Sequence, residues 1–199
     1  MTFDDFIILA RNTFRDPPLA FAQLRRLDLP VSARWMALLL LAALSSIMAA
    51  LAMRVFPALS DGGLGLPELS PMSRAGLQLA GMALTAWLVA VIGGAFGGRG
   101  DFSDALLVVA WLEFLMLAAQ IVQLGVMLVF PLLGSMLGIA ALLAILWASV
   151  QMIKALHGFS NAALVFMGLL GAGLVVLLFL SVMAGALGLM PELPAEVQP

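Results

Sequence analysis

The sequence contains no cysteine and few charged residues. Its 199 residues include nine lysines and arginines, eleven aspartates and glutamates and one histidine, which gives a formal net charge of −2. The absence of cysteine excludes disulfides, thiolate catalysis and zinc or iron–sulfur centres held by cysteine. A chain with so few basic residues offers no positive surface to the phosphates of DNA or RNA, so nucleic acid is not expected among its partners.

Familiar catalytic motifs are also missing. Neither H-E-x-x-H nor G-x-S-x-G occurs, and the single histidine, His157, has no cysteine or nearby carboxylate with which to hold a metal. Gly93 and Gly98 have the spacing of a phosphate-binding loop, but Arg99 and Gly100 stand where that motif requires lysine and a hydroxyl residue. We therefore expect a protein that is not an enzyme and needs no metal or cofactor.

The residues that are abundant are apolar. They make up 64% of the chain, and the mean hydropathy of +1.16 is too high for a soluble domain of this length. Crossing a hydrocarbon core of about 30 Å takes roughly 20 helical residues, and five apolar segments reach that length. They cover residues 35–53, 75–96, 105–130, 132–153 and 162–190. The sequence predicts an all-α, polytopic bundle of five transmembrane helices over residues 34–190.

The first 33 residues have a different pattern, which predicts short amphipathic helices. Apolar side chains recur at helical spacing, with acidic and basic residues on the opposite side. The apolar positions are Phe3, Phe6, Ile7, Ala10 and Phe14. "DPP" at 16–18 ends this helix, and a second amphipathic piece follows. These helices are expected to lie in the cytoplasmic interface or to cap the bundle; alternatively, they form a docking platform for a soluble partner.

Basic residues in the short flanks predict the orientation of the chain. With the amino terminus in the cytoplasm, seven lysines and arginines lie inside and two outside, and the tail at 191–199 is extracytoplasmic. The inside set is Arg11, Arg15, Arg25, Arg26, Arg34, Arg99 and Lys154, and the outside set is Arg54 and Arg74.

A glycine-rich turn is expected between the second and third spans on the cytoplasmic side. Gly97 and Gly98 permit the left-handed backbone that ends a helix, and Asp101 or Ser103 can accept hydrogen bonds from the first amides of the next span. Arg99 in this turn contributes to the predicted orientation of the chain in the membrane. The glycines before it could also let a neighbouring helix approach closely.

The turn between the fourth and fifth spans contains the lone histidine. Gly158 is expected to end one helix, and Ser160 or Asn161 to begin the next. In this position His157 is predicted to be a capping or interface residue.

The third predicted span contains an ionisable side chain. Glu113, Gln120 and Gln123 share one face of the helix, which should point into the bundle. Glu113 is expected either to pair with Gln151 or Lys154 of the fourth span or to be neutral because of burial. This candidate polar site could join helices or carry protons or ions. A third hypothesis, an intramembrane enzyme, is supported by Glu113 alone.

Three segments together resemble bacterial members of the Yip family (Ypt-interacting protein domain). They are "RNTFRDPPLAFAQLRRLDLP" at 11–30, "FGGRGDFSDALLVVAW" at 96–111 and "KALHGFSNAALV" at 154–165. The resemblance implies five spans and, from eukaryotic relatives, a role in membrane traffic with small GTPases bound by the cytoplasmic amino terminus. This chain has no long acidic or proline-rich cytoplasmic domain, which argues against GTPase docking. A bacterial inner membrane is the expected location.

The features together favour a non-enzymatic adaptor, organiser or accessory subunit of a membrane assembly. Its expected partners are membrane lipids and either other membrane-protein subunits or further copies of the chain. The alternative is a small transporter or channel subunit that uses the polar face around Glu113.

Overall fold

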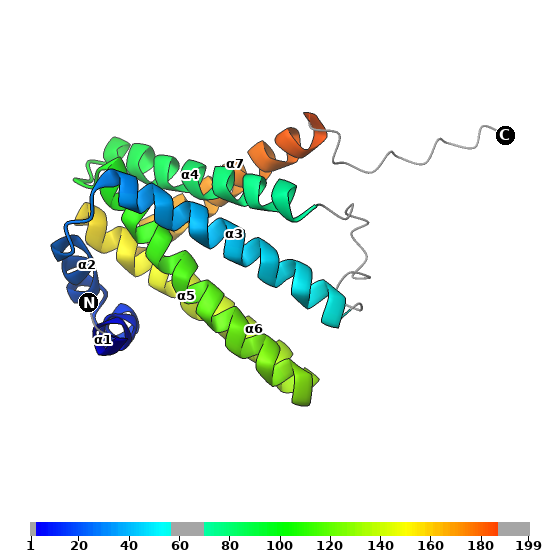
Figure 1. Ribbon diagram of the computed structural model, residues 1–199. Coiled ribbons are helices and arrows are strands. Elements are labelled where there is room, and N and C mark those ends of the chain that lie inside the picture. Colours follow the sequence, from blue (N-terminus) through cyan, green and yellow to red (C-terminus); the bar gives the residue numbers. More distant parts are fainter. Residues whose placement is uncertain (1–2, 57–69, 187–199) are drawn as a thin grey trace.

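The computed structural model describes residues 3–56 and 70–186, and over these residues it consists of helices without strands (Figure 1). Two short helices precede five long ones, which confirms the predicted fold class. The elements are α1 (Phe3–Arg15), α2 (Pro17–Arg26), α3 (Val31–Val55), α4 (Pro71–Ala95), α5 (Phe102–Val129), α6 (Pro131–His157) and α7 (Ala162–Ala186). The end of the fifth predicted span and the tail at 191–199 lie outside the described residues.

The five long helices identify an integral membrane protein. Each has 25 to 28 residues and is apolar enough to cross a bilayer. Large apolar side chains remain exposed along them, and α7 shows this most clearly, with Leu170, Leu174 and Leu177 about half exposed or more. In a membrane these side chains contact lipid tails, which makes their exposure favourable rather than costly.

Helix α5 is the centre of the bundle. It packs against α3, α4 and α6, and its first half holds the longest run of buried side chains, from Ala105 to Leu112. Asp101 begins the helix, because its carboxylate accepts a hydrogen bond from the amide of Asp104 (2.7 Å). Phe130 ends it, and Pro131 starts α6 at once, since proline fits the first turn of a helix but not its interior.

Two glycines let α5 and α6 approach closely. A Cβ at Gly134 would lie 2.7 Å from Met127 Cα, and a Cβ at Gly138 would overlap the amide of Gln123. The two glycines are four residues apart, in the spacing that brings helix backbones together in membranes. This contact also sets an antiparallel register in which Gly134 faces Met127 and Gly138 faces Gln123.

Helices α1 and α2 lie across the end of the bundle where α5 begins and α6 ends (Figure 1). Asp16 separates them and caps α2, accepting a hydrogen bond from the Leu19 amide (3.2 Å). Leu9 of α1 and Phe21 and Leu24 of α2 are buried in the core. Away from this end, the α5–α6 pair and the α4–α7 pair diverge in Figure 1.

Candidate functional site

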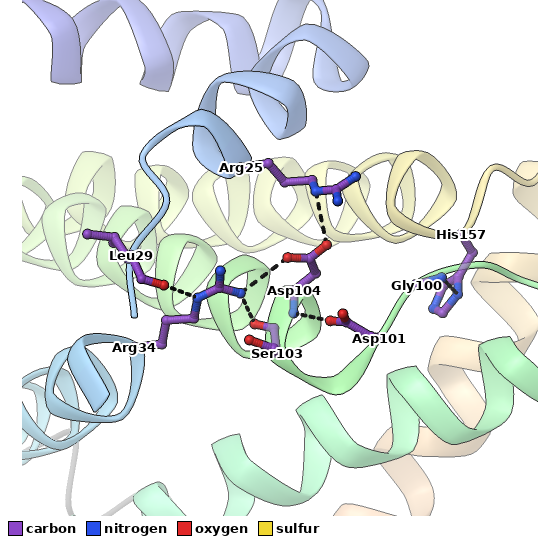
Figure 2. Close-up of polar contacts among 8 residues, drawn as sticks. All are labelled: Arg25, Leu29, Arg34, Gly100, Asp101, Ser103, Asp104 and His157. Atoms are coloured by element: carbon purple, nitrogen blue, oxygen red, sulfur yellow. Dashed lines mark hydrogen bonds and ion pairs between the residues drawn. The ribbon is translucent and has the colours of Figure 1, made fainter. Parts of the chain in front are cut away.

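A charged cluster joins α2, α3 and α5 at the α1–α2 end of the bundle (Figure 2). Asp104, in the first turn of α5, bridges two arginines: Arg34 of α3, at 3.2 Å, and Arg25 of α2, at 3.1 Å. The side chains of Asp104 and Arg34 are only 14% and 10% exposed, whereas that of Arg25 is 61% exposed. The Asp104–Arg34 pair is therefore the one shielded from solvent.

The guanidinium of Arg34 is satisfied by more than this carboxylate. Its Nε donates to the carbonyl of Leu29 (2.9 Å), and its Nη1 donates to the carbonyl of Ser103 (2.5 Å) and to Asp104. Arginine suits this role because its planar fork of donors can serve several acceptors at once. Arg34 thus locks the start of α3 and the segment before it to the first turn of α5.

His157 is the centre of a second cluster at the same end. It is 2% exposed, its Nδ1 accepts a hydrogen bond from the Gly100 amide (3.2 Å), and its carbonyl accepts one from the Arg99 amide (3.2 Å). Because Nδ1 is an acceptor, a neutral ring carries its proton on Nε2. Nε2 has no hydrogen-bond partner among the described residues, although the backbone of Val89 interacts with the ring.

Three glycines surround the imidazole. A Cβ at Gly93, Gly98 or Gly100 would overlap the ring of His157. The ring is also stacked on Phe159, with 5.3 Å between the centroids. The glycine-rich sequence is therefore explained mainly by the close packing of the loop between α4 and α5 onto the end of α6.

Both turns have the capping geometry that their residues favour. Gly97 and Gly158 take left-handed backbone, with φ of 81° and 72°. The side chain of Asn161 accepts hydrogen bonds from the amides of Ala163 and Leu164 and so begins α7, while Ser160 is exposed beside it. The structure thus brings residues from two turns, Gly97, Gly98, Arg99, Asp101, His157 and Ser160, to one end of the bundle.

The five residues of the candidate intramembrane site do not form one site. The α5–α6 register places Glu113 level with Ala148 and Lys154 level with Leu107, about 9 Å further along the axis. Within the described residues, Glu113 forms no ion pair or hydrogen bond, so of the two predicted alternatives, pairing with Gln151 or Lys154 and a carboxyl kept neutral by burial, the single chain does not show the first. Gln120 is half-buried, and Gln123 packs on Gly138.

One contact that the sequence did not reveal fixes α1. Trp111 Nε1 donates a hydrogen bond to the hydroxyl of Thr13 (2.8 Å), and both residues are buried. Phe6 lies 6.3 Å from the Trp111 ring and 5.8 Å from Phe114, measured between centroids. A buried indole needs an acceptor, which is the one signal that could have indicated a partner for Trp111.

Among the described residues, no three His, Cys, Asp or Glu side chains gather in a group that could hold a metal ion. The fold and the clusters define a class of protein: a five-span helical membrane protein with an amino-terminal helix pair fixed to one end. The chain matches the Yip1 domain family over residues 11–183, and it belongs to this family. No curated protein and no solved structure matches the chain significantly.

Proposed function

We propose that the chain is an adaptor or accessory subunit of a membrane assembly and that it presents α1 and α2 to a partner protein. The observation that carries the proposal is the fixed position of this helix pair. Thr13 is bonded to Trp111, Arg25 to Asp104, and Asn12 donates a hydrogen bond to Gln23 (3.1 Å). A surface held in one geometry loses less entropy when it binds a partner than a mobile segment does.

The outward side of α1 combines charge with apolar surface. Asp4, Arg11 and Arg15 are exposed, and the side chains of Ile7 and Phe14 are 52% and 39% exposed. This combination suits a helix at the membrane surface, where the apolar residues enter the interface and the charged residues remain available. A partner at the membrane surface would meet both.

The proposal places this surface in the cytoplasm of a bacterial cell, with the chain in the inner membrane. The excess of basic residues on the α1–α2 end supports this orientation. The partner is either another membrane-protein subunit or a second copy of the chain. A channel subunit built around Glu113 has less support, because Gly138 packs directly on Gln123 of the same face.

Photo-crosslinking in the native membrane tests this proposal. A photoreactive residue at Arg11 or Arg15 is expected to give a discrete protein adduct, whose mass distinguishes a second copy from a different subunit. The same residue at Leu177, on the exposed surface of α7, serves as the control and is expected to label lipid. Lipid adducts alone from Arg11 and Arg15 would contradict the proposal.

A further inference from the structure

A cavity of about 370 Å³ lies between α4, the end of α6 and the first half of α7. Its size falls within the range of roughly 300–1,000 Å³ that is typical of small-molecule sites. Its walls are mostly apolar and include Leu88 and Ile92 of α4, Ile153 of α6, and Leu164 and Gly168 of α7. Neither the charged cluster nor the proposed partner surface on α1 includes these residues.

The cavity has a depth that matches one leaflet of a bilayer. On α7 it extends from the start of the helix to Ala172, which is about 15 Å at 1.5 Å per residue. This is half of a hydrocarbon core of about 30 Å. Beyond this point α7 closes on α4, where a Cβ at Gly81 would lie 3.2 Å from Leu180 and 3.8 Å from Val176.

The end of the cavity at the α6–α7 turn is polar, since Ser160 and Asn161 line it. Arg99 of the α4–α5 loop is near this end, because its amide donates a hydrogen bond to the carbonyl of His157, and the Arg99 side chain is exposed. Lys154 follows Ile153 in the last turn of α6. Within the described residues, neither Arg99 nor Lys154 forms an ion pair.

We propose that this cavity binds one anionic phospholipid, with an acyl chain between α4 and α7 and the headgroup phosphate at Arg99. The apolar walls fit the chain, and the unpaired cation complements the phosphate. Such a lipid would fill the space at the base of the His157 cluster, since Gly93 and Phe159 both line the cavity and contact the imidazole. This inference does not depend on the proposed adaptor role.

Titration of the delipidated full-length protein in detergent with phosphatidylglycerol tests the site. Native mass spectrometry is expected to show one saturable lipid per chain, bound more tightly than phosphatidylcholine with the same acyl chains. Arg99→Gln is expected to weaken phosphatidylglycerol binding about tenfold and to leave phosphatidylcholine nearly unchanged, because only the charge-assisted bond is lost.

Substitution of Gly168 tests the acyl-chain position without breaking the fold. A Cβ at Gly168 would meet only Ile92, at 4.0 Å, so Gly168→Ala introduces no overlap. Because Gly168 lines the cavity, the larger side chain of Gly168→Leu is expected to fill more of it. Lipid affinity is expected to fall from glycine to alanine to leucine. Gly171→Leu is the matched control, because a Cβ at Gly171 would meet nothing within 4 Å. Melting temperatures and helical content verify that each variant folds.

Three results would overturn the proposal. The first is that the native chain binds no saturable lipid, and the second is that a folded Gly168→Leu variant binds phosphatidylglycerol with unchanged affinity and stoichiometry. The third is a dimer that Gly168→Leu converts to monomer without any change in lipid binding, which would show that a helix of a second copy occupies the cavity.

Discussion

The residues around His157 show how a single side chain can determine the sequence of a distant loop. Gly93, Gly98 and Gly100 come from α4 and the following loop, about 60 residues before the histidine. A Cβ at each of these glycines would nevertheless overlap the ring of His157. Glycine is required at these three positions because there is no room for a side chain. Backbone conformation is not the reason, since only Gly97 in this loop has positive φ.

Gly93→Ala tests this explanation. The added methyl is expected to destabilise the protein by about 1–3 kcal/mol, because the imidazole cannot move far in a packed site. Thermal unfolding in detergent measures the effect. Gly94→Ala is the control and is expected to be neutral or stabilising, since its Cβ would meet nothing and alanine favours helix.

The double variant makes this test more specific. In a His157→Ala background the ring is absent, so Gly93→Ala should destabilise the protein much less than it does in the native background. The stability effects of the two substitutions should therefore be strongly non-additive. Additive melting-temperature changes would show that the glycine is needed for a different reason.

Asp104 and Arg25 give contrasting predictions within one cluster. Asp104→Asn leaves the shielded Arg34 without its counter-ion, and we expect a loss of about 2–3 kcal/mol of stability. Arg25→Gln removes a mostly exposed partner and should cost less than about 1 kcal/mol. Melting temperatures compare the two, and equal losses would contradict the central role assigned to the Asp104–Arg34 pair.

Among the elements, the α5–α6 hairpin depends most directly on backbone proximity. Gly134→Ala is expected to separate the two helices, because its Cβ would meet the backbone of Met127, which cannot move aside. Gly138→Ala should reduce stability less than Gly134→Ala, because only the flexible Gln123 side chain must shift. Combining Gly138→Ala with Gln123→Ala should remove that loss of stability. Gly125→Ala, with open space around its Cβ, is the control for melting-temperature measurements.

The existence and order of the helices could be predicted from sequence because their signals are local. Apolar runs, the Asp101 cap and the left-handed Gly97 and Gly158 all act within a few residues. Pairing between helices could not be predicted in this way. Glu113 and Lys154 both lie on long apolar helices, but the register set by Gly134 and Gly138 keeps them apart.

The two turns of the candidate site could be predicted separately from sequence, but their packing against each other could not, because that packing is not a local property. The sequence indicated two turns with capping residues, and nothing local showed that His157 of one turn fills the space beside the glycines of the other. The hydrogen bond from Trp111 to Thr13 spans 98 residues and depends on how α1 folds back onto α5. Such contacts are properties of the packed bundle.

For the whole molecule, the proposed adaptor role requires that the α1–α2 end faces the cytoplasm, where the partner can reach it. The α1–α2 end carries more basic residues than the opposite end: Arg15 and Arg26 lie at the first, and Arg54, near the end of α3, lies at the second. The chain has no native cysteine, so a single introduced cysteine reports its own position without background.

The most direct test is the labelling of Arg15→Cys and Arg54→Cys, each alone, with a membrane-impermeant maleimide in sealed vesicles of both orientations. Both positions are exposed, so labelling depends on the side of the membrane. Arg15→Cys is expected to be labelled only from the cytoplasmic side and Arg54→Cys only from the opposite side. Labelling of Arg15→Cys from outside, or of both positions from one side, would contradict it.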